Sequence, residues 1–335
     1  MNTKTPPTVR SCNIGVFGAT GMAGRQVVKI VHEREFRHTS IRLFASKGSV
    51  GQIIEMGDQK LVVEHVEPEN VWKLDLDLAF LAVDSDKSKN LTPALLAAGT
   101  TVIDKSSAYR MDPKVPLVIP EINRNLLLGR PQLVTNPNCS TAIALMALWP
   151  LHLRFGLLNC FISTYQSVSG SGAKGVQDLV GQPEKPFYPH PIASNVIPHI
   201  DRFGRDGYTG EETKMYEEMR KITGLSDLRV SATCVRVPVV RGHSMVINAE
   251  FHAHVTVDEA RKAIAGFPGA VLIDDPEMNE YPMPLHSIGQ ERVAVGRFRL
   301  DNVFTNGLAF FVAGDNLWRG AALNAILNAE TLLSL

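Results

Sequence analysis

The sequence lacks the features that mark metal-binding, disulfide-rich and membrane proteins. Its four cysteines form no C-x-x-C pair and have no disulfide-like or zinc-like spacing, so we expect free thiols in a reducing cytosol and no metal site. No apolar run reaches the eighteen residues of a membrane span, and residues 1–10 contain no apolar signal-peptide core. We therefore expect a soluble, cytoplasmic protein.

Net charge is absent as well, because 34 basic residues balance 34 acidic ones. A chain without an overall field does not attract nucleic acid or membrane surfaces, so we expect a small-molecule substrate and neither of those partners. Any anion must then be bound by local groups. At 335 residues, of which 44% are hydrophobic, the chain exceeds the size of one comfortable core, which predicts two domains.

A strand, a glycine turn and a helix are predicted at the start of the chain. The apolar run 13–17 leads into Gly18, Gly21 and Gly24, and residues 25–33 have the pattern of an amphipathic helix. This order is typical of a Rossmann unit, in which the glycines let the backbone approach a pyrophosphate at the helix N-terminus. A purely structural turn is the alternative.

The rest of the first 136 residues continues this alternation. It predicts a largely parallel sheet with helices on both faces, hence an α/β domain. The expected strands are 40–45, 59–66, 78–82, 101–103, 117–118 and 132–135, with a helix over 87–98.

From residue 158 the apolar pattern changes to longer alternating runs. These predict a mixed or antiparallel sheet in an α+β domain, with strands at 158–169, 229–239, 244–255, 292–300 and 307–313. Residues 181–207 have no periodicity and are expected to form a long loop on the surface or against a partner subunit. A final helix over 315–335 is expected to complete the first domain, which gives domains of 1–136 with 315–335, and 137–314.

The end of the second predicted strand indicates which dinucleotide binds. NAD sites carry an acid there for the ribose 2′-hydroxyl, whereas this chain has Ser46, Lys47 and Ser49. Hydroxyls and a cation suit a 2′-phosphate, which favours NADP. A solvated polar turn is the alternative for Lys47.

Cys139 lies between the apolar run 133–134 and a helix-like stretch at 142–149. A sulfur at the start of a helix has its thiolate favoured by the helix dipole, which makes it a candidate nucleophile. The alternative is a small buried hydrophobe. A thiolate beside a nicotinamide can attack an aldehyde, lose hydride to the cofactor and leave a thioester that water or phosphate opens.

That chemistry also needs a group that takes the hydroxyl proton of the hemithioacetal, and an imidazole suits this task. Among ten histidines, His243 follows a β-like run beside a flexible Gly242. His243 is therefore the candidate acid/base.

Six segments, taken in order, resemble the aspartate-semialdehyde dehydrogenase family. They are GATGMAG at 18–24, PNCST at 137–141, YQSVSGSG at 165–172, EETK at 211–214, RVPVVRGHS at 236–244 and GDNLWRGAA at 314–322. The resemblance runs along nearly the whole chain, and the combination is far more specific than any one segment. It implies a second domain like that of glyceraldehyde-3-phosphate dehydrogenase, which serves catalysis and dimerisation.

The resemblance implies roles residue by residue. Cys139 corresponds to the nucleophile, His243 to the acid/base and Gln166 to the residue that orients the intermediate. Arg236 corresponds to the ligand of the substrate carboxylate and Glu211 to that of its ammonium. The other implied substrate and phosphate ligands are Lys214, Arg110, Asn138, Ser169 and Gly170. Without the family, Glu211 and Lys214 would be an ordinary i,i+3 surface pair.

The family also implies the cofactor-binding residues. These are Gly18, Ala19, Thr20, Gly21, Met22, Ala23, Gly24, Ser46, Lys47, Ser49 and Asn316. The family often has an arginine after the second strand, and this chain has Gly48 there. Lys47 supplies a point charge without the planar fork of arginine, which leaves NAD as an alternative to NADP.

The implied activity is NADP-linked reductive dephosphorylation of L-4-aspartyl phosphate to L-aspartate 4-semialdehyde, in the biosynthesis of lysine, threonine, methionine and diaminopimelate. The first alternative is an N-acetylglutamyl-phosphate reductase, whose substrate has no free ammonium. The second is a non-catalytic homologue. A homodimer or homotetramer is expected.

Overall fold

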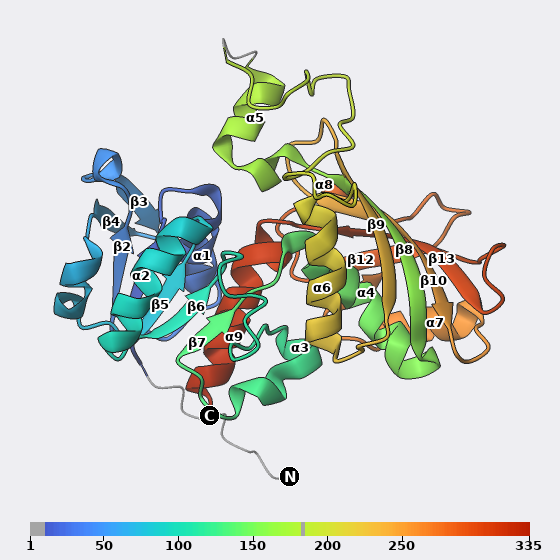
Figure 1. Cartoon of the computed structure of the whole chain (residues 1–335), viewed down its shortest axis with the longest axis horizontal. Coiled ribbons are helices and arrows are strands. Elements are labelled where there is room, and N and C mark those ends of the chain that lie inside the picture. The colour runs from blue at the N-terminus through green and yellow to red at the C-terminus, as the bar shows by residue number, and fades with distance from the viewer. Residues whose placement is uncertain (1–10, 182–184) are drawn as a thin grey trace. The chain divides into compact units, whose positions relative to one another are not determined.

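The computed structural model describes residues 11–181 and 185–335 (Figure 1). The described chain forms two compact units. The first comprises residues 11–136 and 322–335, and the second comprises the described residues of 137–321.

The first unit is built on a seven-stranded sheet of order β3-β4-β2-β1-β5-β6-β7. All neighbours pair in parallel except β3 and β4, which form an antiparallel edge. The strands are β1 (Asn13–Phe17), β2 (Ser40–Phe44), β3 (Ile53–Met56), β4 (Gln59–Glu64), β5 (Leu78–Leu81), β6 (Thr101–Asp104) and β7 (Leu133–Thr135). The predicted doubly wound α/β architecture is confirmed.

Helices α1 (Met22–Glu33) and α2 (Ser85–Ala97) follow β1 and β5. Helix α1 buries Val27, Val28, Ile30 and Val31, as its apolar stripe predicts. Short helical segments fill the remaining connections, namely η1 (Lys47–Ser49), η2 (Pro68–Leu74), α3 (Pro120–Asn123) and η3 (Arg124–Leu127).

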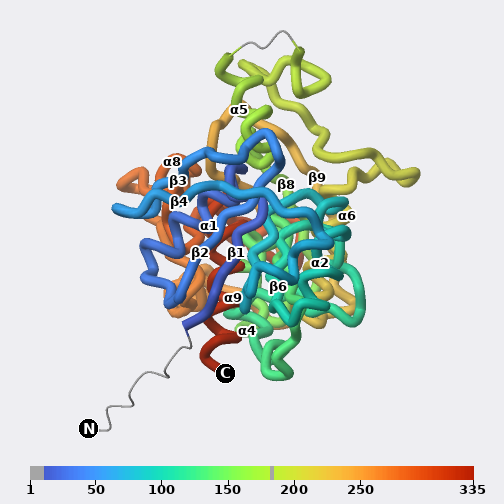
Figure 2. The backbone as a smooth tube through the Cα atoms, turned by 90° about the vertical axis from the view of Figure 1, so that its left-hand side faces the viewer, coloured from blue at the N-terminus to red at the C-terminus, as the bar shows by residue number. Residues whose placement is uncertain are grey.

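Helix α9 (Leu323–Leu333) belongs to the first unit although it lies at the end of the chain (Figure 2). It packs on α1 and α3. The Arg34 guanidinium donates to both carboxylate oxygens of Glu330 at 2.9 and 3.0 Å, which fixes the returning helix to the residue after α1.

The second unit has a six-stranded mixed sheet of order β11-β12-β13-β10-β8-β9. Its strands are β8 (Leu157–Gln166), β9 (Arg229–Arg236), β10 (His243–Phe251), β11 (Ala270–Leu272), β12 (Val293–Leu300) and β13 (Gly307–Gly314). The β8–β9 and β11–β12 pairs are parallel and the others antiparallel. This confirms the mixed sheet expected from the longer alternating runs.

One face of this sheet is covered by α4 (Cys139–Phe155), α6 (Gly210–Thr223) and α7 (Val257–Ala265) (Figure 1). Helix α4 is apolar almost all round and buried, which is why it lies at the centre of the unit. Two shorter helices, α5 (Ala173–Val180) and α8 (Pro284–Ser287), lie in the connections. On the other face, alternate residues of β8, including Phe161 and Tyr165, are exposed.

Several predicted elements differ in detail. Residues 117–118 form no strand, because Leu117 makes only an isolated bridge to Thr135. Residues 315–335 are not one helix: a π-helical turn, η5 (Trp318–Ala322), precedes α9. The structural division falls between Ala321 and Ala322 rather than at residue 315, because the Asp315 carboxylate accepts hydrogen bonds from Arg241 and Gly289 in the second unit.

The segment predicted as a long loop, 181–207, has no helix or strand in its described residues. Tyr188, Ile192 and Ile197 pack on Val168 in a small apolar cluster. Residues 182–184 of this segment, and the polar N-terminus 1–10, lie outside the described residues. None of the described helices is both long enough and apolar enough to span a bilayer.

Candidate active site

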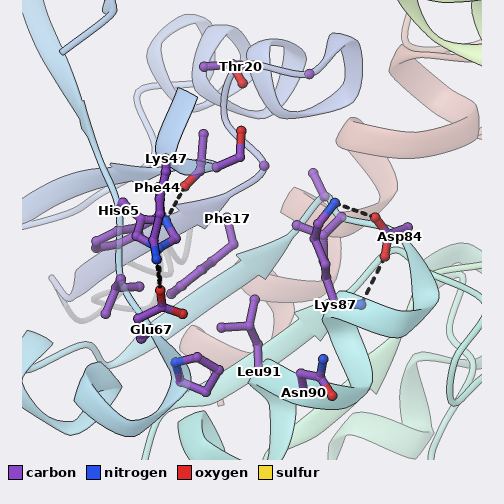
Figure 3. A pocket seen from close by; sticks show the side chains of 18 of the residues that line it. Phe17, Thr20, Phe44, Lys47, His65, Glu67, Asp84, Lys87, Asn90 and Leu91 are labelled. Carbon is purple, nitrogen blue, oxygen red and sulfur yellow. Dashed lines mark hydrogen bonds and ion pairs between the residues drawn. The ribbon is translucent and has the colours of Figure 1, made fainter. Parts of the chain in front are cut away.

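A cavity of about 730 Å³ lies at the carboxyl ends of the strands in the first unit. The glycine turn after β1 lines it with Gly18, Thr20 and Gly21, and the turn after β2 adds Ser46, Lys47 and Gly48. Figure 3 shows Lys47, His65 and Glu67 grouped together in it, apart from Asp84 and Lys87. Position and lining match a dinucleotide site in a doubly wound sheet.

Two glycines of this turn are required by its geometry. Gly18 has a φ of +81°, and a Cβ at Gly24 would overlap the carbonyl oxygen of Gly18. Gly21 is the N-cap of α1, with no side-chain cap. The backbone N–H groups at this helix start therefore remain a favourable environment for a phosphate.

The lysine predicted to bind a 2′-phosphate has an acidic partner. Lys47 Nζ lies 2.6 Å from Glu67 Oε1, and the same oxygen lies 3.2 Å from His65 Nε2. His65 Nδ1 lies 2.9 Å from the carbonyl oxygen of Ala45. Because both ring nitrogens face acceptors, the imidazolium is stabilised; the bond to Ala45, then that to Glu67, raises the pKa of His65.

His65 and Glu67 were not among the predicted cofactor residues. The predicted strand 59–66 includes His65. Strand β4 in fact ends at Glu64, so both residues lie beyond it, next to the carboxyl end of β2. Because parallel neighbours end at one edge of a sheet, the polar residues that follow this strand are the sequence signal for His65 and Glu67.

In the second unit, Cys139 is the first residue of α4. The side-chain oxygen of Asn138 caps the helix by accepting the N–H groups of Ser140 and Thr141 at 2.8 and 3.3 Å. Gly320 allows close packing here, since a Cβ at that position would lie 2.7 Å from the Cβ of Cys139. The strand-to-helix position predicted for the sulfur is confirmed.

His243 is fully buried at the start of β10, and its Nε2 lies 3.4 Å from Cys139 Sγ. The Ser167 backbone N–H donates to its Nδ1 at 3.1 Å. Because an N–H group only donates, this contact needs a lone pair on Nδ1 and a proton on Nε2. Burial, and secondarily the charge of Arg236, hold the pKa of His243 well below its usual value.

Glu211 connects several predicted residues. Its Oε1 accepts from Asn138 Nδ2 at 2.9 Å and from Gln166 Nε2 at 3.3 Å, and its Oε2 lies 3.6 Å from Lys214 Nζ. The carboxylate is buried next to the helix that starts with Cys139. Spacing alone made Glu211 and Lys214 a surface pair, but the fold turns Glu211 inward.

Arg236 is buried at the end of β9. Its Nη1 donates to the Ser167 carbonyl at 2.7 Å, while its Nε has no hydrogen-bond partner among the described residues. Gly170 makes room for it, because a Cβ there would lie 2.8 Å from Arg236 Nη1 and 3.3 Å from the His243 ring. A buried guanidinium with an unused donor suits a planar anion.

The comparisons with known proteins agree with this geometry. Residues 13–129 match the family model described as semialdehyde dehydrogenase, NAD binding domain, and residues 148–319 match the semialdehyde dehydrogenase, dimerisation domain. The chain is 42% identical over 332 residues to aspartate-semialdehyde dehydrogenase of Aquifex aeolicus, covering 96% of this chain and 97% of that one. The chain belongs to the aspartate-semialdehyde dehydrogenase family.

Other members of the aspartate-semialdehyde dehydrogenase family give the same picture. The Bacillus subtilis protein of that name is 38% identical, with 97% of this chain and 99% of the relative covered. The solved structure of aspartate semialdehyde dehydrogenase II from Vibrio cholerae, complexed with ASA, superimposes with a TM-score of 0.92 at 33% identity, covering 96% and 98%. The resemblance inferred from the sequence is confirmed, and the chain is an oxidoreductase of this family.

Two residues that the family resemblance predicted make hydrogen bonds within their own units, and their predicted roles stay predictions. Arg110 belongs to the first unit, where its guanidinium donates to the carbonyl oxygens of Asn136 and Lys105 at 2.8 and 2.7 Å. Asn316, expected to bind cofactor, belongs to the second unit and accepts from Gly242 N–H at 3.0 Å and from Ser167 and Ser169 hydroxyls at 3.2 Å. Those contacts give Asn316 a part in holding the loop before His243.

Two carboxylates of this dehydrogenase were not identified from the sequence. Asp201 lies 2.6 Å from Lys214 Nζ. Burial raises the pKa of Asp201, but the hydrogen bond and charge of Lys214 outweigh this and leave it lowered. Glu218, buried two turns along α6 from Glu211, accepts the backbone N–H of Asn138 at 2.6 Å. No sequence pattern distinguished either from a surface acid.

Proposed function

We propose that the protein catalyses the reversible, NADP-dependent reductive dephosphorylation of L-4-aspartyl phosphate to L-aspartate 4-semialdehyde, in the cytoplasm, for aspartate-family amino-acid biosynthesis. The observation that carries the proposal is the 3.4 Å contact between Cys139 Sγ and Nε2 of a buried His243, at the start of a helix. The names and high coverage of the relatives support the substrate.

Cys139 is the proposed nucleophile. Its sulfur bonds to the carbonyl carbon of the acyl phosphate, and the bond from that carbon to the phosphate oxygen breaks, which leaves a thioester and free phosphate. The N-terminus of α4 favours the thiolate, although the N–H groups of Ser140 and Thr141 are already used by the Asn138 cap.

Bound NADPH would supply a hydride, and the thioester on Cys139 would take it up at the carbonyl carbon to become a hemithioacetal. His243 is proposed to exchange the proton of the hemithioacetal oxygen through Nε2, the nitrogen that faces the sulfur. When the carbon–sulfur bond breaks, the aldehyde leaves and Cys139 regains its thiolate.

The residues that the family resemblance indicates are proposed to bind the aspartyl portion and the phosphate. Arg236, with its unused Nε donor, fits the α-carboxylate. Glu211 fits the α-ammonium, and Lys214 and Arg110 are proposed phosphate ligands. Gln166 orients the acyl group, and Asn138, Ser169 and Gly170 complete the substrate site.

The cavity of the first unit is proposed to bind NADP. The turn from Gly18 to Gly24 would hold the pyrophosphate, and Ser46, Lys47 and Ser49, together with His65, would surround the 2′-phosphate. Glu67 opposes this assignment electrostatically, because its carboxylate neutralises Lys47. A preference for NADP therefore requires the cations and hydroxyls to outweigh Glu67.

A homodimer is proposed, formed through the uncovered face of the six-stranded sheet. Aromatic pairs lie on that face, with Phe161 stacked on Phe304 and Tyr165 on Phe311. Phe161 is 54% exposed, which is unusual for an aromatic residue in the middle of a strand. The match to a dimerisation domain over 148–319 supports an oligomer. Sedimentation velocity tests it, with a monomer as the contradicting result.

The decisive experiment follows absorbance at 340 nm with aspartate semialdehyde and phosphate, using NADP and NAD in parallel. We expect reduction of NADP at the higher kcat/KM. N-acetylglutamate semialdehyde serves as the competing substrate, and its preferential oxidation would reassign the enzyme to the related reductases. No turnover with either aldehyde would favour a non-catalytic homologue.

A further inference from the structure

Ser167 presents two different groups to the same nitrogen of His243. Its backbone N–H lies 3.1 Å from Nδ1 and its hydroxyl oxygen lies 3.0 Å from Nδ1. Both residues are fully buried. Within the described part of the chain, no other group is hydrogen-bonded to Nδ1.

The two groups suit different forms of the imidazole. The N–H only donates, so it stabilises the form with a lone pair on Nδ1 and the proton on Nε2. A hydroxyl both donates and accepts hydrogen bonds, so Ser167 Oγ can accept a hydrogen bond from an N–H group at Nδ1. Ser167 therefore has a partner for each tautomer.

The proposed chemistry needs the form that the hydroxyl stabilises. Nε2 accepts a proton only when its lone pair is free, which puts the proton of the neutral ring on Nδ1. Once Nε2 is protonated, the ring is an imidazolium with N–H groups at both positions. In both states, the neutral ring and the imidazolium, the N–H group at Nδ1 needs a hydrogen-bond acceptor. The backbone N–H of Ser167 cannot serve as one.

The hydroxyl of Ser167 has a further partner that keeps it available. Ser167 Oγ lies 3.2 Å from Asn316 Oδ1, which also accepts the Gly242 N–H at 3.0 Å and the Ser169 hydroxyl at 3.2 Å. Asn316 Nδ2 donates to Ser169 Oγ at 3.0 Å. When Nδ1 carries a proton, it can donate to Ser167 Oγ, and the Ser167 O–H can donate to Asn316 Oδ1 or to Ser169 Oγ, which lies 3.1 Å away.

Among the described residues, the charges around the ring offer no carboxylate to stabilise a proton on it. Cys139 faces Nε2, and the Arg236 cation lies close enough to depress protonation of the ring. Arg241 and Asp315, next to the loop before His243, form an ion pair 2.7 Å apart, so their two charges compensate each other. A buried imidazolium without a carboxylate partner depends on neutral acceptors.

We propose that Ser167 is a positioning residue that lets His243 change tautomer: its N–H holds the Nε2–H form against Cys139 Sγ, and its hydroxyl, backed by Asn316, holds the Nδ1–H form that exchanges protons at Nε2. When the ring changes tautomer, a water molecule supplies a proton to Nδ1 and Nε2 gives its own proton to Cys139 Sγ or to the substrate oxygen. During turnover the proton then moves only between that oxygen or the sulfur and Nε2, and no covalent bond of Ser167 breaks. This inference rests on the acid/base role proposed for His243.

The test compares Ser167→Ala with Ser167→Thr, which keeps the hydroxyl, and with Ser287→Ala as a matched control. Ser287 is also buried in the same unit, and its hydroxyl donates to the Met283 carbonyl. We expect Ser167→Ala to lower kcat roughly 10- to 100-fold, the usual range for impaired acid–base catalysis or a wrong tautomer. KM should change by less than about threefold, Ser167→Thr should recover most of kcat, and Ser287→Ala should match the unchanged protein.

A second readout reports the tautomer directly. In protein labelled with ¹⁵N-histidine, the His243 signals are assigned by their loss in His243→Asn and followed from pH 6 to 9. We expect Nδ1 to carry a proton part of the time in the unchanged protein and Ser167→Thr, and to remain unprotonated in Ser167→Ala. In the same variant, the part of the kcat–pH profile that reports proton exchange by His243 should disappear.

The outcomes separate the two proposals. An unchanged kcat in Ser167→Ala, or a lower kcat with the same Nδ1 protonation as the unchanged protein, would overturn the inference. The expected change in protonation, in a protein that turns over neither aldehyde, would support the effect of Ser167 on the tautomer of His243 and would remove both the proposed function and the part of Ser167 in it. If Ser167→Ala does not fold, Ser167→Cys replaces it as the test. Cysteine has a similar volume but is a weak hydrogen-bond acceptor, so this variant must show the same loss of kcat and of Nδ1 protonation.

Discussion

The polar groups of the two units differ mainly in their exposure to water. In the first unit, the Lys47 side chain is 76% exposed and its partner Glu67 is 43% exposed. In the second unit, His243 is 0% and Arg236 is 5% exposed. Exposed ion pairs interact weakly because water and salt screen them, whereas buried polar groups are strongly coupled to their partners.

This difference suggests a division of work. In the first unit, the glycine turn and apolar side chains such as Phe17 and Leu91 line the cavity together with exposed charged groups. The second unit fixes side chains in a buried network, where the loss of one hydrogen bond is not replaced by water. Substitutions should therefore abolish chemistry in the second unit, and alter folding or affinity in the first.

The largest expected effect is a loss of turnover without a loss of NADP binding. Cys139→Ala should lower turnover by roughly 10⁴-fold or more, because it removes the only proposed nucleophile. NADP binding, followed by fluorescence titration, should change by less than about twofold, since the cavity is lined by residues of the first unit.

Cys160→Ala is the control for that variant. Burial raises the pKa of the Cys160 thiol to about 12, so it is an unreactive side chain of β8 and its loss should leave turnover close to normal. Normal turnover in Cys139→Ala would instead refute the covalent mechanism.

The next effect concerns the backbone of the first unit. Gly24→Ala should destabilise the protein by about 1–3 kcal/mol, because the added Cβ overlaps the Gly18 carbonyl and the glycine turn must shift. Thermal unfolding measures this, and Gly48→Ala is the matched control, since nothing lies within 4 Å of a Cβ there. Equal melting temperatures for the two variants would show that the turn is not tightly packed.

Glu211→Gln tests the substrate assigned to the second unit. Replacing a buried carboxylate that binds an ammonium should raise KM for aspartate semialdehyde roughly 10- to 100-fold, the range for a charge-assisted hydrogen bond. Steady-state kinetics measure the change. Glu217→Gln, a half-buried acid on the same helix, is the control. An unaltered KM in Glu211→Gln would point to a substrate without an ammonium group.

The smallest effect is expected at the rim of the first cavity. Glu67→Gln removes the anion that neutralises Lys47 and should strengthen NADP binding by up to about fivefold, with less change for NAD. Titrations at low and high salt should show the gain shrinking as salt rises. Glu35→Gln, an exposed acid outside the cavity lining, is the control. Weaker NADP binding in Glu67→Gln would mean that Glu67 positions the cations instead.

Much of the fold was predictable because its signals are local. The glycine turn, the amphipathic stripe of α1 and the alternating runs of β8, β9, β10 and β13 each depend on neighbours in the sequence. The edge strand β3 was not predicted, and residues 117–118 were predicted as a strand although Leu117 makes only an isolated bridge. Both errors arise because segments of two to four residues carry too little periodicity. The break before α9 was missed because contacts of Asp315 with the second unit decide it.

The candidate site divides in the same way. The family motifs predict the site residues. The structure brings the buried side chains of His243, Gln166, Glu211 and Arg236 together next to the half-buried Cys139, with Ser167 and Asn138 as linking residues. The roles of these residues remain predictions. The sequence did not indicate Asp201 and Glu218, because their partners Lys214 and Asn138 are distant in sequence. It did not indicate His65, because the predicted strand ends two residues later than β4 does.

The sequence by itself determined the glycine turn, the start of a helix at Cys139 and the change of sheet type between the two units, since steric and capping preferences act over a few residues. Only the tertiary structure decided that His243, 104 positions away, faces the sulfur, that Ser167 offers its Nδ1 two partners, and that Glu67 pairs with Lys47. Such contacts depend on the register of strands and on which side chains are buried together, and packing of the whole chain sets both.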